Sequence, residues 1–247
     1  MKKIMPPLTL MLLLLGIWEG LARIIASPYI LPSPLQIVQK MWELREPLLT
    51  IHLPATFAII AIGLAISLVL GVVLALLMDA SVWIERAFYP LLVISQTIPT
   101  TALAPIFVLW FGYTIWSKVL VTVLIAFFPI AMNTFDGLRS VKKGQLELLQ
   151  TFGASHFQQF WKLKVPSALP SFFTGLKIAV PLTVIGAAIG EWLGAQAGLG
   201  YFSKRMMTQM DGAGVFAPII VLSLMAMLFA AIVAVVEKKY ITWRKES

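Results

Sequence analysis

Cysteine is absent from this chain of 247 residues, and histidine occurs only as His52 and His156. The lack of cysteine excludes a disulfide framework and a thiolate metal site, and two histidines are too few for a histidine-rich metal centre. Charged residues are scarce too, at 12% of the chain, whereas soluble domains carry roughly 25%. We therefore expect no metal and no cofactor, and the composition excludes an ordinary soluble domain.

Enzyme motifs are also lacking. The glycine loop of a Walker A nucleotide site does not occur, so the chain does not bind ATP by that route. The Gly-Ala-Ser-His sequence at residues 153–156 contains a serine and a histidine. Neighbouring side chains on a helix point about 100° apart, so these two cannot form a catalytic dyad. We expect no catalytic residue.

What the chain does contain is apolar sequence, since 60% of its residues are hydrophobic and lie in long, nearly uncharged runs. A helix needs about 20 apolar residues to cross about 30 Å of hydrocarbon, and it satisfies its own backbone groups in lipid. Six runs reach this length. The sequence therefore predicts an all-α integral membrane protein, with one transmembrane domain over residues 1–247. The predicted transmembrane helices are about residues 8–26, 54–78, 87–111, 115–135, 171–193 and 215–236.

Basic residues are distributed unequally between the two sides that these six helices define. Loops rich in lysine and arginine stay in the cytoplasm. We therefore expect both termini to be cytoplasmic, and the net charge of +8 needs no nucleic-acid partner. The side with the termini carries twelve basic residues, Lys2, Lys3, Arg86, Arg139, Lys142, Lys143, Lys162, Lys164, Lys238, Lys239, Arg244 and Lys245, and the other carries six, Arg23, Lys40, Arg45, Lys118, Lys204 and Arg205.

The stretch from Glu147 to Pro170 is too polar to cross a bilayer, yet it has helical periodicity. Gly153 interrupts the pattern and tolerates the left-handed conformation that ends many helices. Ser155, with Gln158 three residues later, has the pattern of a capping box that begins a second helix, and Pro166 is expected to end it. The sequence predicts two short amphipathic helices joined by a glycine turn, in a loop at about residues 140–170. A segment lying on the membrane surface is the alternative.

This stretch resembles the Glu-Ala-Ala loop of the membrane subunits of binding-protein-dependent ABC importers. In that motif Glu-Ala-Ala is followed by three residues, Gly, nine residues and Ile-x-Leu-Pro. Glu147, Gly153 and Pro166 occupy the Glu, Gly and Pro positions, while Leu148 and Leu149 replace the two alanines. The resemblance implies a cytoplasmic coupling loop, between the fourth and fifth transmembrane helices, that docks on an ATPase. The coupling residues it implies are Glu147, Gly153, Ala154, Ser155, His156, Phe157 and Pro166.

The resemblance covers nearly the whole chain and points to the nitrate, sulfonate and taurine branch, through the prolines at 99 and 105 and the stretch 190–201. It implies a multi-pass permease subunit in the lipid of the bacterial cytoplasmic (inner) membrane, importing a small organic or anionic solute. The implied partners are an ABC ATPase in two copies, an extracytoplasmic substrate-binding protein and a second permease copy in a homodimer, with a heterodimer left open. Permeases for thiamine pyrimidine precursors share residues 191–201, so this substrate stays an alternative. A secondary transporter is the alternative of another class, although no internal repeat is seen.

Polar residues within the predicted transmembrane helices are candidates for a substrate path. Broken backbone at membrane depth is tolerated where it lines a cavity, so the residues around Pro99 are the first candidates. Their threonines have the alternative of bonding to carbonyl groups of their own helix. The path candidates are Gln96, Thr97, Thr100, Thr101, Asn133 and Glu191. The glycines at 186, 190, 194 and 198 predict a smooth helix face, either for packing within the chain or near a subunit interface.

Overall fold

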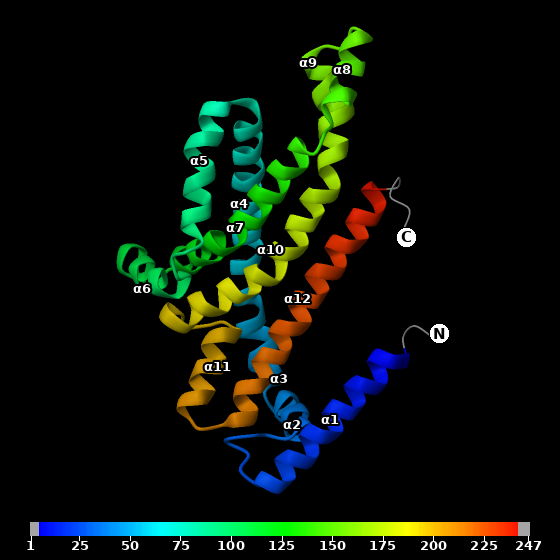
Figure 1. The fold of residues 1–247 in the computed structure, drawn as a ribbon. Coiled ribbons are helices and arrows are strands. Elements are labelled where there is room, and N and C mark those ends of the chain that lie inside the picture. Colours follow the sequence, from blue (N-terminus) through cyan, green and yellow to red (C-terminus); the bar gives the residue numbers. More distant parts are fainter. Residues whose placement is uncertain (1–4, 242–247) are drawn as a thin grey trace. The chain divides into compact units, whose positions relative to one another are not determined.

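The computed structural model describes residues 5–241, so Lys2, Lys3, Arg244 and Lys245 lie outside the described residues. Every regular element of this described part is a helix, which confirms the all-α prediction (Figure 1). The elements are α1 (Met5–Ile25), α2 (Pro34–Glu43), α3 (Arg45–Pro47), the π-helix η1 (Leu48–His52), α4 (Leu53–Ala80), α5 (Val82–Ser95), α6 (Thr100–Phe111), α7 (Ile115–Arg139), α8 (Lys143–Thr151), α9 (His156–Gln159), the π-helix η2 (Phe160–Lys164), α10 (Val165–Gly194), α11 (Leu199–Thr208) and α12 (Gly212–Tyr240).

Five helical stretches in residues 5–241 are long and apolar enough to cross a membrane. They overlap the predicted first, second, fourth, fifth and sixth transmembrane helices. The predicted third one consists of α5 and α6, which are bent by 101° at a break around Pro99. Pro105, the other proline of the predicted third helix, lies inside α6 and does not interrupt it. The five stretches are Met5–Ile25, Arg45–Ala80, Ile115–Arg139, His156–Gly194 and Gly212–Tyr240.

Ion pairs at the ends of three helices determine how the bent pair crosses. Arg139 at the end of α7 pairs with Asp79 near the end of α4 and with Glu85 in the first turn of α5, so these ends lie together. The 25 residues of α7 extend over about 37 Å, more than the hydrocarbon thickness, so α7 begins on the opposite side. Only residues 112–114 separate α6 from α7, so α6 ends on that opposite side as well. Counted as one crossing, α5 and α6 bring the candidate crossings in the described residues to as many as six.

The chain forms two compact units, the first made of Met1–Phe57 and Ala195–Leu224, the second of Ala58–Gly194 and Met225–Ser247. In the first unit, Lys40 Nζ lies 3.0 Å from Asp211 Oδ2, and this hydrogen bond raises the pKa of Lys40. The other carboxylate oxygen of Asp211 accepts the N–H of Gly214 at 2.8 Å. Asp211 therefore holds α2 while it caps the start of α12.

The start of α11, also in the first unit, is held by two buried side chains. His52 Nδ1 accepts the N–H of Gly198 at 3.1 Å, and Thr56 Oγ1 accepts the N–H of Leu199 at 2.8 Å. The His52 ring lies 4.5 Å from the ring of Phe202. Gly198 has a φ of +124°, a conformation that favours glycine. These contacts satisfy N–H groups that a helix start would otherwise leave without partners.

In the second unit α7 and α10 run side by side (Figure 1). A Cβ atom on Gly186 would lie 2.9 Å from the Cα of Thr122, and one on Gly190 would lie 2.9 Å from the Cα of Lys118. At these two positions the glycine face therefore serves packing within the chain. Gly198 does not belong to this face, because α10 ends at Gly194.

Pro166 does not end a helix, so this prediction is wrong. α9, η2 and α10 form one continuous stretch, His156–Gly194. In η2 the N–H of Val165 bonds to the carbonyl of Phe160, five residues back. Proline has no N–H and crowds the carbonyl four residues before it, and a wide π-turn relieves both problems. The same arrangement occurs at η1, which directly precedes Leu53 and Pro54.

Candidate functional site

The turn after α8 has the geometry that the sequence predicts. Gly153 has a φ of +72°, in the left-handed region. Its N–H donates to the carbonyl of Gln150 at 2.8 Å, and the N–H of Ala154 donates to the carbonyl of Leu149 at 3.0 Å. These two bonds make a Schellman motif, which closes the end of a helix. The turn in the polar segment (residues 140–164) is therefore a defined structure and not a loose loop.

The next helix starts at the predicted capping box. Ser155 Oγ accepts the N–H of Gln158 at 3.3 Å, and Gln158 Oε1 accepts the N–H of Ser155 at 2.9 Å. Gln159, which is buried, donates from Nε2 to the carbonyl of Ala154 at 2.8 Å. The turn is thus bonded to the helix on either side of it, and the angle between α8 and α9 is fixed by backbone and side-chain hydrogen bonds.

Large apolar side chains are exposed on the surface of the polar segment. Phe152 is 79% exposed, Phe157 71% and Trp161 54%. The rings of Phe157 and Trp161 lie 6.1 Å apart, one helical turn from each other. Glu147 lies exposed on α8. Apolar side chains gathered within one short segment, among polar neighbours, are typical of a surface that binds another protein.

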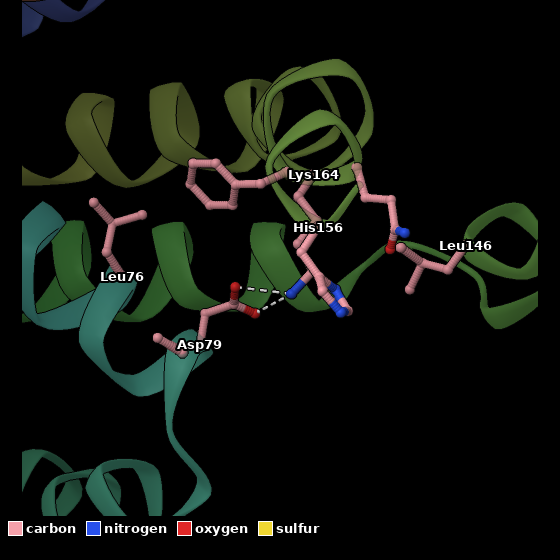
Figure 2. Close-up of a pocket in the computed structure, with 8 residues that line it drawn as sticks. Leu76, Asp79, Leu146, His156 and Lys164 are labelled. Atoms are coloured by element: carbon pink, nitrogen blue, oxygen red, sulfur yellow. Dashed lines mark hydrogen bonds and ion pairs between the residues drawn. The ribbon is translucent and has the colours of Figure 1, made fainter. Parts of the chain in front are cut away.

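A pocket of about 490 Å³ lies beside the polar segment (Figure 2). One wall comes from the end of α4, and the other from α8, α9 and η2. Lys164 Nζ crosses between the walls and lies 2.8 Å from both carboxylate oxygens of Asp79, whose side chain is only 6% exposed (Figure 2). The lining residues are Leu76, Asp79, Ala80, Leu146, His156, Gln159, Phe160 and Lys164.

The residues around Pro99 occupy the break between α5 and α6. Gln96, Thr97 and Thr101 are exposed, and Thr100 begins α6. Thr97 Oγ1 donates to the carbonyl of Ile94 at 2.7 Å, so this threonine follows the alternative of bonding to its own helix. The structure thus keeps these four residues together at a bend.

The other two path candidates do not join that group or each other. Asn133 lies on α7, where Nδ2 donates to the carbonyl of Pro129 at 2.8 Å. Glu191 is buried at the end of α10 and interacts electrostatically with Lys118. Lys118 and Asn133 are 15 residues apart on α7, which corresponds to about 22 Å of helix. No single cluster contains all six candidates.

Residues 67–242 match the family described as "Binding-protein-dependent transport system inner membrane component". The chain belongs to this family. The permease is 61% identical over 240 residues to the formylaminopyrimidine transport permease protein ThiX of Halalkalibacterium halodurans, with 97% of this chain and 96% of the relative covered. It is 31% identical over 244 residues to the putative aliphatic sulfonates transport permease protein SsuC of Bacillus subtilis, with 97% and 88% covered.

Among solved structures, the permease is similar to a chain of the inward-facing MetNI methionine ABC transporter. The TM-score is 0.60 at 21% identity, and the match covers 85% of this chain and 98% of the other. This likeness concerns the fold. The family identifies the permease as a multi-pass membrane subunit of an ABC importer, in the inner membrane of bacteria, that transports and is not itself an enzyme. Family membership implies an ATPase and a substrate-binding protein as partners.

Two features of the permease were missed by reasoning from its sequence. Lys118 was counted among the basic residues on the side opposite the termini, but it is buried at 6% exposure, and its Nζ donates to the carbonyls of Tyr113 and Thr114 at 2.8 and 2.9 Å. The Asp79–Lys164 pair joins residues 85 positions apart. The only signal for that pair was an isolated aspartate at the end of an apolar run.

Proposed function

We propose that this permease imports formylaminopyrimidine or a closely related pyrimidine precursor of thiamine. The observation that carries the proposal is the identity of 61% to a formylaminopyrimidine permease over nearly the full length of both chains. Identity to a sulfonate permease is half as high. This difference favours the thiamine-precursor alternative over a sulfonate, taurine or nitrate substrate.

The polar segment is the coupling loop in this proposal, and it docks on the ATPase. Its support is the combination of a fixed turn at Gly153 with exposed rings of Phe157 and Trp161. Both termini and the polar segment lie in the cytoplasm. Because Lys118 is buried, the charge count that supports this orientation becomes twelve basic residues against five, one fewer than the six counted from the sequence.

Two copies of this chain would frame the path, with two ATPase subunits and an external binding protein. The path would pass the bend between α5 and α6, where Gln96, Thr97, Thr100 and Thr101 place polar groups at a break in an apolar helix pair. Asn133 and Glu191 would line it at other depths. Native mass spectrometry of the purified complex, with this chain as the only permease expressed, checks the homodimer through a mass of two permeases and two ATPases.

Uptake by reconstituted vesicles tests the substrate. The permease is co-expressed with the ATPase and binding protein encoded beside it, and vesicles containing ATP are offered labelled formylaminopyrimidine, taurine or nitrate. We expect ATP-dependent uptake of formylaminopyrimidine that unlabelled taurine in excess does not reduce. Uptake of taurine or nitrate without uptake of formylaminopyrimidine would refute the proposed substrate but leave the importer class intact.

A further inference from the structure

One carboxylate holds both ends of the polar segment. Arg139, the last residue of α7, immediately precedes the segment, and its Nε lies 3.9 Å from Asp79 Oδ1. Lys164, the last residue of η2, ends the segment, and its Nζ lies 2.8 Å from both carboxylate oxygens of Asp79. Residues 140–163 therefore form an excursion whose two ends meet at a single buried side chain at the end of α4.

The same cluster also reaches α5. Arg139 pairs with Glu85 in the first turn of α5, in addition to Asp79. Since α4 ends at Ala80 and α5 starts at Val82, the two carboxylates flank one tight connection. The two cations lie at the two ends of the polar segment, and the two anions belong to the hairpin of α4 and α5. The cluster is thus an electrostatic link between two separate parts of the second unit.

The electrostatic link lies beside a gap in the packing between the polar segment and α4. Where the polar segment faces α4, a pocket of about 490 Å³ separates the walls, and the Lys164–Asp79 pair crosses it (Figure 2). Apolar packing is therefore incomplete at this junction. Asp79 is 6% exposed, so its attraction for Lys164 is little screened by solvent. A displacement of the polar segment would act directly on α4 through this carboxylate, in addition to the apolar packing of α4 and α5 against α7.

We propose that Asp79 is a positioning residue that transmits the movement of the polar segment to α4 and α5, and through α5 to the bend at residues 96–99. This inference rests on the proposed function, because it takes the polar segment as the ATPase-docking element. Asp79 does not touch substrate or ATP. Its role is to make the hairpin of α4 and α5 follow the polar segment when the ATPases close.

The test measures ATP hydrolysis by the whole complex in vesicles, with and without the binding protein loaded with formylaminopyrimidine. Asp79→Asn keeps the shape of the side chain and removes its charge. We expect the complex to assemble and to keep basal hydrolysis, while stimulation by the loaded binding protein falls about fivefold or more, a typical size for coupling between sites. Asp79→Glu restores the charge and should recover most of the stimulation, which mere loss of packing would not predict.

Lys164→Gln provides a second variant, at a side chain that is 25% exposed. If both residues act through their pair, Asp79→Asn combined with Lys164→Gln loses no more stimulation than either single variant. Glu237→Gln is the matched control, because Glu237 pairs with Lys177 between α12 and α10 without contacting the polar segment. This control should keep its stimulation.

Two results would overturn the inference. In one, Asp79→Asn and Lys164→Gln are stimulated like the unmodified complex. In the other, both variants lose the ATPase during purification, which would mean that the pair only shapes the docking surface. Failure of the proposed function would give a different result. If the polar segment is not the ATPase-docking element, a substitution that strains the turn at Gly153 leaves ATPase binding and uptake intact, whatever the Asp79 variants do.

Discussion

Gly153→Ala is the sharpest test of the polar segment as the docking element. An added Cβ at this position would have no heavy atom within 4 Å, so the substitution causes no clash with neighbouring residues. Its cost comes from the backbone, because a φ of +72° is left-handed, and that conformation costs an L-residue roughly 1–2 kcal/mol. The substitution thus isolates the conformation of the turn from its packing.

That cost is too small to unfold six membrane-crossing helices, but it changes the population of the turn. In the Gly153→Ala permease without bound ATPase, the turn relaxes out of the left-handed conformation. Binding of the ATPase must then restore that conformation. The apparent affinity for the ATPase is reduced in proportion to the fraction of molecules that keep the binding-competent turn. A cost of 1–2 kcal/mol corresponds to a loss of roughly 5- to 30-fold.

The assay is a titration of permease in nanodiscs with fluorescently labelled ATPase. Gly144→Ala is the control, because Gly144 lies in α8, its Cβ would also meet nothing within 4 Å, and its φ is not positive. Alanine is favoured over glycine in a helix, so this control should bind at least as well as the unmodified chain. Equal affinities of Gly153→Ala and Gly144→Ala would refute the argument that the turn positions the docking surface.

Four further predictions concern the same protein. Ser155→Ala removes the cap of α9, worth about 1 kcal/mol, and should weaken ATPase binding several-fold in the same titration. Phe157→Ala removes a ring that is 71% exposed, so it should lower ATPase affinity about tenfold or more without lowering expression. The purified permease should release no phosphate from ATP until the ATPase subunit is added, and steady turnover by the permease alone would contradict this. Thr100→Val combined with Thr101→Val should change uptake kinetics while ATPase binding stays normal, and unchanged uptake would assign both threonines to packing.

Much of the fold could be predicted because its signals are local. The apolar runs locate α1, α4, α7, α10 and α12, since helix length against bilayer thickness is a strong constraint. Gly153 and Ser155 predict the turn, because a left-handed residue and a capping box each depend on a few neighbouring residues. These features need no knowledge of what lies elsewhere in the chain.

What could not be predicted depends on distant contacts. Lys118 was counted among the basic residues on the side opposite the termini, but in the fold it can satisfy two carbonyl groups and lie near Glu191. Pro166 was expected to end a helix, since nothing nearby in the sequence indicates that a π-turn will accommodate it. The start of α11 is held by His52 and Thr56, more than 140 positions away.

The continuity at Pro166 changes how movement of the polar segment reaches the membrane. Because α9, η2 and α10 are one helix, a displacement at Phe157 enters α10 without passing a loop. Gly186 and Gly190 bring the backbone of α10 against that of α7 with no room for a Cβ, so these two helices resist sliding and move together. The pocket lies between the end of α4 and the elements α8, α9 and η2, and the Lys164–Asp79 pair spans it. The ion pair therefore gives the polar segment a direct connection to α4, in addition to the apolar packing of α4 and α5 against α7.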